Sequence, residues 1–256
     1  MAKIITVSNQ KGGVGKTTTS INLSASLAAN DKKVLLCDID PQANASSGIG
    51  IEVNEIEYSI YDVLVNKVPI KDAILSTEMD NLYILPSHID LVGAEIEMIN
   101  IDKREFVLKN IFSDILADYD YIIIDCPPSL GLLTLNSLVA ANTVLISVQC
   151  EYYALEGLGQ LLNTISIVRQ SLNKNLELEG VLLTMYDARL RLSAQVMEEV
   201  KRHFGNKVMG TVIHRNVRLA EAPSHGKPAI LYDAVSSGAA NYLELAKEIL
   251  MHDNNL

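Results

Sequence analysis

The sequence predicts an α/β fold with one doubly wound, mostly parallel sheet flanked by helices. Short apolar runs rich in β-branched residues recur along the chain, as in strands that are buried on both faces. Segments with apolar residues at helical spacing lie between these runs, so strands and helices alternate. In such a sheet ligands bind at the carboxyl ends of the strands. The residues that follow each strand are therefore the first candidates for function.

The expected strands cover residues 4–8, 33–38, 82–86, 121–125, 144–148, 180–184 and 208–213. The expected helices cover residues 18–29, 104–117, 155–172, 193–204 and 237–251, and Ser193 is a candidate N-cap of the fourth. Residues 44–80 are acidic and carry mixed signals, so we expect loops and short helices there. No repeat or linker divides the chain, and we expect a single domain over residues 1–256.

The charge is unevenly distributed. The chain carries a net charge of −10. Residues 185–228 hold eight basic and four acidic side chains, whereas residues 51–102 hold eleven acidic and two basic ones. An acidic total does not favour a nucleic-acid binder, but the basic segment can form one positively charged surface.

Three cysteines, Cys37, Cys126 and Cys150, lie far apart in or beside apolar runs. They are expected to be buried thiols in a reducing cytosol, with metal or iron–sulfur ligation as the less favoured reading. The five histidines have no metal-binding spacing. We find no signal peptide and no apolar run of membrane-spanning length, so we expect a cytoplasmic protein.

A glycine-rich turn, Lys11-Gly12-Gly13-Val14-Gly15-Lys16-Thr17-Thr18, joins the first expected strand to the first expected helix. Its glycines let the backbone approach an anion, and the free N–H groups of the helix point at that anion. Lys16 can reach the β- and γ-phosphates of a nucleotide, and Thr17 can ligate Mg²⁺. Gln10 stands where the usual pattern has glycine. The additional cation, Lys11, is expected near the same phosphates or those of a neighbouring site.

Two other expected strands end in carboxylates. Asp38 and Asp40 supply two carboxylates at this strand end, so one can face the nucleotide while the other bonds elsewhere. Asp125 ends an apolar run in the form of a Walker B strand, whose carboxylate holds Mg²⁺ through water. Its alternative role is to cap a loop. We expect these strand ends and the glycine-rich turn to converge on a Mg²⁺–nucleotide site.

Five segments carry a family resemblance. The sequences K-G-G-V-G-K-T-T (11–18), L-L-C-D-I-D-P-Q-A-N (35–44) and Y-I-I-I-D-C-P-P-S-L (121–130) resemble the deviant Walker A ATPases, the ParA/MinD superfamily of P-loop NTPases. The sequences T-M-Y-D-A-R (184–189) and N-V-R-L-A-E-A-P-S-H-G-K-P (216–228) are similar to the chromosome-partitioning ParA (Soj) branch. The resemblance covers essentially the whole chain. It implies a Mg²⁺-dependent ATPase that is weak alone and stimulated by DNA and a ParB-type protein.

The resemblance also implies roles for single residues. Lys11 matches the signature lysine that contacts the ATP of the partner subunit in a sandwich dimer. Lys16 matches the P-loop lysine, and Thr17 the magnesium ligand. Asp40 matches the carboxylate that positions or activates the attacking water, and Asp125 matches the Walker B aspartate. The implied catalytic residues are thus Lys11, Lys16 and Asp40, and residues 11–18 bind the nucleotide.

The same resemblance places Arg215, Asn216 and Val217 beside the adenine ring, and it makes Arg189 and Arg218 contacts to DNA without sequence preference. The implied partners are a second copy of the chain in an ATP-dependent homodimer, non-specific double-stranded DNA and a ParB-type centromere-binding protein. The implied location is the cytoplasm, associated with the nucleoid. Since eight residues precede the Asn9-Gln10 turn, we expect no N-terminal helix-turn-helix domain.

Alternative functions exist within the superfamily. A MinD-like ATPase that positions the division site cycles on membranes through a basic amphipathic C-terminal helix. Residues 245–256 contain one lysine and two acidic side chains, so we expect no stable membrane association. A nitrogenase-reductase-like redox protein needs paired cysteines at a bridged cluster. An amidoligase-like synthetase needs a pocket for an acid or amine substrate, for which we find no sequence signal.

Overall fold

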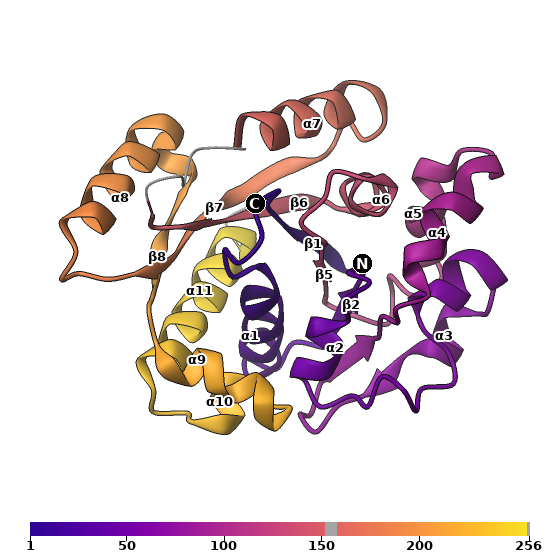
Figure 1. The fold of residues 1–256 in the computed structure, drawn as a ribbon, viewed down its shortest axis with the longest axis horizontal. Coiled ribbons are helices and arrows are strands. Elements are labelled where there is room, and N and C mark those ends of the chain that lie inside the picture. Colours follow the sequence, from indigo (N-terminus) through magenta and orange to yellow (C-terminus); the bar gives the residue numbers. More distant parts are fainter. Residues whose placement is uncertain (152–157, 255–256) are drawn as a thin grey trace.

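The computed structural model describes residues 1–151 and 158–254. Within these ranges the strands form one eight-stranded sheet in the order β3-β4-β2-β5-β1-β6-β7-β8 (Figure 1). Every neighbouring pair is parallel except β3 and β4. The strands are β1 (Lys3–Ser8), β2 (Val34–Asp38), β3 (Leu75–Ser76), β4 (Leu82–Leu85), β5 (Tyr121–Asp125), β6 (Thr143–Gln149), β7 (Glu177–Tyr186) and β8 (Val208–His214). The predicted doubly wound, mostly parallel sheet is confirmed.

Helices cover both faces of this sheet. In the described ranges they are α1 (Lys16–Ala28), α2 (Asn44–Gly48), α3 (Ile70–Ala73), α4 (Leu91–Glu97), α5 (Val107–Phe112), α6 (Leu132–Ala140), α7 (Leu158–Ser171), α8 (Arg191–Phe204), α9 (Val217–Glu221), α10 (Ala229–Tyr232) and α11 (Ser237–Asn254). Helices α1 and α11 bury their apolar residues on one face, and α5 to α8 bury theirs on the other (Figure 1). The predicted helix over 155–172 is found from Leu158 onward; residues 155–157 lie outside the described ranges.

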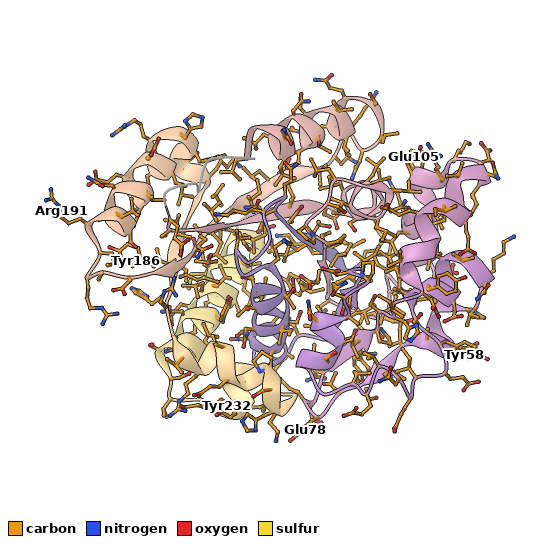
Figure 2. The ribbon with its side chains drawn as sticks, in the orientation of Figure 1. Tyr58, Glu78, Glu105, Tyr186, Arg191 and Tyr232 are labelled. Carbon is orange, nitrogen blue, oxygen red and sulfur yellow. The ribbon has the colours of Figure 1, made fainter. Side chains whose placement is uncertain are left out.

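Parts of the basic and acidic segments lie far apart, although Lys227 of the basic segment pairs with Glu78 of the acidic one at 2.8 Å. Figure 2 shows Arg191, at the start of α8, at one edge, and Tyr58 and Glu105 at the opposite edge. The uneven charge of the sequence is therefore also uneven in space.

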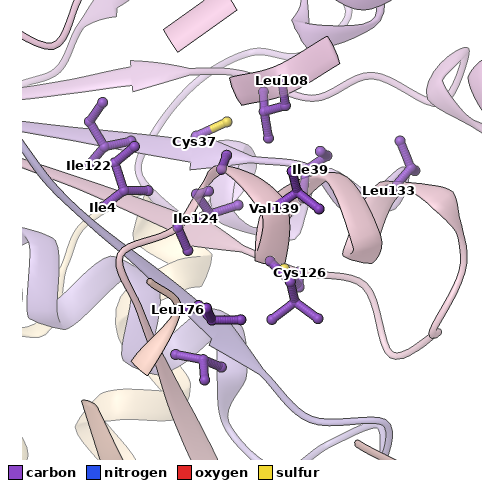
Figure 3. Packing of buried hydrophobic residues seen from close by; sticks show 14 of the residues in the cluster. Ile4, Cys37, Ile39, Leu108, Ile122, Ile124, Cys126, Leu133, Val139 and Leu176 are labelled. Carbon is purple, nitrogen blue, oxygen red and sulfur yellow. The ribbon is translucent and has the colours of Figure 1, made fainter. Parts of the chain in front are cut away.

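Strand β5 explains why its sequence is apolar without a break. Ile122 and Ile124 pack into one core cluster, whereas Tyr121 and Ile123 pack into the cluster on the other face. Figure 3 shows Ile122 and Ile124 together with Cys126 in the first of these clusters. A strand that is covered on both faces needs apolar residues at every position. All three cysteines are free and buried, as predicted.

The predicted helix over 104–117 is interrupted, because a side chain from a distant helix replaces one of its hydrogen bonds. Asn136 of α6 donates to the carbonyl oxygen of Arg104 at 2.9 Å and accepts from the backbone N–H of Leu108 at 3.1 Å. These two backbone groups would bond each other in a continuous α-helix. Residues Arg104–Phe106 instead form a 3₁₀ turn, and α5 runs only from Val107 to Phe112.

Three further differences between the prediction and the structure concern single residues or short elements. The prediction of Ser193 as an N-cap is wrong, because α8 starts at Arg191 and the Ser193 hydroxyl donates to the carbonyl oxygen of Cys150. Helix α6 was not predicted because it is buried around most of its circumference and therefore lacks a polar face. Strand β3 was not predicted because it consists of Leu75–Ser76 alone and depends on its antiparallel partner β4.

The sheet order brings the three predicted strand ends together. Strand β5 lies between β1 and β2, with Val7 and Asp38 both opposite Asp125. The loops that follow these strands therefore open at the same edge of the sheet. In the part of the chain that the structure describes, no helix combines the length and apolar character needed to cross a membrane.

Candidate functional site

The glycine-rich turn forms an anion cradle at the start of α1. Gly13 and Gly15 adopt left-handed backbone angles, with φ of 73° and 85°. These angles favour glycine, which has no Cβ to clash. No side chain caps the N-terminus of α1, so its first N–H groups remain available to an anion.

Gln10, which replaces the usual glycine, ties this turn to α7. Its side-chain amide donates to Oε1 of Gln160 at 2.7 Å. The neighbouring Asn9 anchors the turn to β6 by donating to the carbonyl oxygen of Ser147 at 2.6 Å, and it also accepts from the backbone N–H of Lys11. Glutamine at this position therefore adds a contact between the turn and α7, one of the helices that cover the sheet.

Lys16 is the buried cation of the site. Its side chain folds back over the turn, and Nζ donates to the carbonyl oxygen of Lys11 at 3.1 Å. Lys16 is only 6% exposed, and burial lowers the pKa of its ammonium group, while Asp125 and Asp40 oppose this shift. The Lys16 ammonium group is buried and bonds a neutral carbonyl oxygen. A negatively charged phosphate that binds beside it would therefore stabilise its charge.

Lys11 lies at the outer side of the same turn. It is half-buried, and among residues 1–151 and 158–254 no side chain is paired with its ammonium group. Its charge is thus free to meet an anion that approaches the turn from outside.

A cavity of about 440 Å³ opens in front of this cradle. Its walls include Lys16 and Thr17 from the turn, Asp40 from the end of β2 and Pro128 from the loop after β5. The remaining turn residues at its wall are Gly12, Gly13, Gly15 and Thr18. Val14 is buried behind the turn, and its carbonyl oxygen accepts a hydrogen bond from Thr184.

The two carboxylates after β2 have different surroundings. Asp38 is fully buried and accepts hydrogen bonds from the backbone N–H and hydroxyl of Ser46, both at 2.8 Å, and from the backbone N–H of Asp40 at 3.1 Å. Asp40 instead reaches the cavity and accepts from the N–H of Gln42 at 3.0 Å. Asp38 therefore shapes the loop, and Asp40 faces the space where a nucleotide can bind.

We expect Asp38→Ala to destabilise the fold. The change leaves the buried N–H groups of Ser46 and Asp40 without their acceptor, at a cost of about 2 kcal/mol. Urea unfolding measures this cost as a lower midpoint at unchanged slope. A variant as stable as the parent would contradict the structural role of Asp38.

Asp125 has a carboxylate oxygen that can coordinate a cation. Its Oδ1 accepts from the Ser20 hydroxyl at 2.8 Å, whereas the buried Oδ2 has no hydrogen-bond partner among the described residues. Burial and the nearby Asp38 raise the pKa of the Asp125 carboxyl, and the nearby hydroxyl groups of Thr17 and Ser20 oppose that shift. Magnesium commonly binds through one or two protein oxygens together with substrate phosphates. The carboxylate of Asp125 and the hydroxyl of Thr17 fit such an ion.

A second cavity, of about 190 Å³, lies on the other side of Gly15. Of the three residues predicted beside adenine, Arg215 and Asn216 line it. Val217 does not and is 69% exposed, so the structure does not bring it to this cavity. Its wall also includes residues that the sequence did not single out, among them Met185, Leu219 and Tyr242. The available signal was the position of Met185 directly after the expected strand 180–184, although β7 in fact extends to Tyr186.

The two arginines predicted to bind DNA are exposed but paired. Arg189 is 87% exposed and forms a two-pronged ion pair with Asp187, at 2.9 and 2.7 Å. Arg218 contacts Glu221 at 2.8 Å and Asp233 at 3.1 Å. Each guanidinium group has five N–H donors, so donors that do not bond these carboxylates can still reach a phosphate.

Comparisons with known proteins place the chain in a family. Residues 2–178 match a family model described as an AAA domain. The sporulation initiation inhibitor protein Soj of Bacillus subtilis is 60% identical over 249 residues, covering 97% of this chain and 98% of that protein. The chain belongs to the Soj/ParA family. A second member, the chromosome partitioning protein ParA of Myxococcus xanthus, is 54% identical over 99% of this chain and 89% of its own length.

A similar solved structure contains a nucleotide and magnesium. The cobyrinic acid a,c-diamide synthase of Mycobacterium smegmatis, crystallised with ADP and magnesium, is 38% identical with a TM-score of 0.88. The alignment covers 99% of this chain and 96% of that one. The prediction of ATP and Mg²⁺ as the cofactors of this Soj/ParA-type site agrees with that complex.

Proposed function

We propose that this chain is a Mg²⁺-dependent ATPase that acts in chromosome partitioning. The observation that carries the proposal is the shared cavity of Lys16, Thr17 and Asp40, with the unpartnered carboxylate oxygen of Asp125 behind it. Membership of the Soj/ParA family supports the biological role, because the relatives are named for partitioning and for sporulation control.

In this proposal, different residues of the site have different roles in ATP hydrolysis. Phosphoryl transfer depends mainly on positioning and on neutralising the charge of the phosphates. Lys16 and the N–H groups at the start of α1 supply positive charge at the phosphates. Asp40 orients the attacking water and can accept its proton. Mg²⁺, held by Thr17 and Asp125, would neutralise further phosphate charge when bound.

Dimerisation completes the site in this proposal. Lys11 carries a charge that no described residue of its own chain pairs, at the outer side of the phosphate turn. A second copy facing this turn would receive Lys11 at its own nucleotide. Hydrolysis then requires an ATP-dependent homodimer, and the monomer is expected to hydrolyse ATP only weakly.

Non-specific DNA binding is the second property of the proposed dimer. The part of the basic segment 185–228 at the start of α8 lies at one edge of the molecule, where Figure 2 shows Arg191. Affinity for DNA rises steeply with the number of phosphates that are neutralised. A dimer doubles that number, so ATP controls DNA binding through dimerisation. The proposed cycle ends when a ParB-type partner stimulates hydrolysis in the nucleoid-associated dimer.

The test is the rate of phosphate release, measured with and without DNA and with and without a ParB-type protein. The proposal expects a slow basal rate and a faster rate with both. A rate that is independent of both additions would overturn the partition role while leaving the ATPase in place.

We expect Arg189→Glu to weaken DNA binding while nucleotide-driven dimerisation is retained, and Arg218→Glu to do the same. Each change removes two phosphate contacts per dimer, so the slope of log K against log salt falls in magnitude by about 2. Filter binding at several salt concentrations measures this slope. Arg169→Glu, an exposed arginine of α7, is the matched control. Unchanged binding in both variants would place the DNA surface elsewhere.

Two alternatives have direct tests. Because a solved relative is named as an amide synthase, turnover of ATP that requires a carboxylic acid and an amine donor would favour a synthetase. Sedimentation with anionic liposomes in the presence of ATP would favour a MinD-like function.

A further inference from the structure

The outer face of α4 carries an apolar stripe that the fold leaves uncovered. Ile89, Val92, Ile96 and Ile99 are 55%, 59%, 71% and 53% exposed. Val92 and Ile96 lie on α4, Ile89 lies in the turn before it and Ile99 in the 3₁₀ turn after it, and their spacing places them along one side of this segment. Four large aliphatic side chains in one row form a contiguous patch rather than scattered surface residues.

The opposite side of α4 is apolar as well. Leu91, Ala94 and Met98 are fully buried in the core below it. A helix that is apolar on two sides is normally covered on both. Here α4 lies at the edge of the molecule (Figure 1), where it contacts the helical segment Asp62–Asn66. The inner row secures the fold, and the outer row is available to a partner.

The charge around the stripe defines the chemistry of that partner. Asp90 and Glu97 are exposed on the helix, and Asp102 is exposed just beyond it. Residues 72–102 contain no lysine or arginine, and His88 pairs with Asp90 at 3.0 Å. A second copy docking through the same face would bring like charges together. A segment with apolar residues on one side and lysine or arginine beside them matches both the stripe and its rim.

Helix α4 also contacts the loop that leads from Asp125 to α6. Glu95 accepts a hydrogen bond from the backbone N–H of Leu133 at 3.2 Å. A Cβ added at Gly131 would overlap the Glu95 carboxylate, so the loop passes directly against this side chain. The same loop places Pro128 at the wall of the nucleotide cavity. A shift of α4 therefore reaches that cavity through one short segment.

We propose that the outer face of α4, formed by Ile89, Val92, Ile96 and Ile99, docks a basic amphipathic segment of a partner protein. Glu95 transmits the docking to residues 127–131 and thereby changes the rate of hydrolysis. The docking stands on the surface alone, whereas the transmission rests on the proposed ATPase activity. Glu95 is a positioning residue, because it acts through the loop and not on the nucleotide.

The test uses a synthetic amphipathic helix of about 18 leucines and lysines, about five turns, and a matched peptide in which glutamate replaces lysine. Fluorescence anisotropy without nucleotide is expected to show salt-dependent binding of the lysine peptide only. Val92→Ser with Ile96→Ser is expected to weaken this binding about tenfold or more, because apolar area is lost from the contact. Ile167→Ser, at an exposed isoleucine of α7, is expected to bind like the parent.

A second pair of changes keeps the shape of the surface. Glu97→Gln with Asp102→Asn is expected to weaken binding at low salt and to flatten its salt dependence. If the lysine peptide binds both double variants as tightly as the parent, the docking surface is wrong. If Val92→Ser with Ile96→Ser leaves peptide binding unchanged but abolishes nucleotide-driven dimerisation, a second copy covers the stripe and the proposal is overturned.

The proposed effect of docking on ATP hydrolysis, through Glu95, is measured separately from binding. The lysine peptide is expected to change the ATPase rate of the parent but not of Glu95→Gln, while both bind the peptide with equal affinity. A peptide effect that persists in Glu95→Gln would overturn the role of Glu95. If the parent does not hydrolyse ATP, the proposed function fails, and the anisotropy measurements still decide the docking.

Discussion

Lys16→Ala is expected to abolish ATP binding, with an affinity loss of about 100-fold or more. The substitution removes a buried ammonium group that is 6% exposed and stands between the phosphate turn and the carboxylates of Asp40 and Asp125. Without this cation those two carboxylates repel the incoming phosphates. A charge-assisted bond to a buried anion contributes about 1.5–3 kcal/mol, and the added repulsion extends the loss. Equilibrium binding of a fluorescent ATP analogue measures the change.

The matched control for this prediction is Lys11→Ala. It removes an equal charge from the same turn, but Lys11 makes its expected contact across the dimer. This variant is expected to bind ATP as a monomer and to lose nucleotide-driven dimerisation. Equal ATP affinity in Lys16→Ala and the parent would show that the cavity in front of the turn is not the phosphate site.

Asp40→Ala is expected to separate binding from hydrolysis. The variant is expected to bind ATP, to dimerise and to hold DNA, while hydrolysis falls by about 10² to 10⁴, the usual contribution of a general base. The reason is the position of Asp40 at the cavity wall, where its carboxylate can meet a water beside the phosphates. Single-turnover phosphate release from the preformed complex measures the chemical step directly.

Asp38→Ala is the informative comparison, because the two residues are two positions apart. Loss of Asp38 is expected to lower stability, whereas loss of Asp40 is expected to lower turnover at nearly unchanged stability. Rapid hydrolysis by Asp40→Ala would contradict its catalytic assignment. Equal unfolding midpoints for the two variants would contradict the division of roles between them.

Much of the fold was predictable because each strand or helix has a characteristic pattern of apolar residues in its own segment of the sequence. The run Tyr121–Asp125 is apolar at every position, since its strand is buried on both faces. The phosphate turn was predictable for a related reason. Positive backbone angles at Gly13 and Gly15 require residues without a Cβ, and that requirement is visible as glycine.

Other features were not predictable because they depend on contacts between distant residues. Asn136 interrupts the helix predicted over 104–117 from a position 32 residues away, by taking the carbonyl oxygen of Arg104. Gln10 stands where the usual phosphate turn has glycine, and the sequence did not show that its side-chain amide donates a hydrogen bond to Gln160 on α7. Val217 was expected at the adenine, yet its side chain is exposed while Met185 lines the cavity.

The sequence by itself determined the parallel α/β fold, the family and the residues at the three strand ends, because strand burial and phosphate binding each impose a local pattern. Only the tertiary structure showed that Asp38, the carboxylate without an assigned role, is buried and accepts hydrogen bonds from Ser46 and Asp40. It also decided which apolar residues of α4 stay exposed. The physical reason is that burial and hydrogen-bond partners are properties of the packed chain. Residues that look alike in sequence acquire different surroundings when elements far apart along the chain come together.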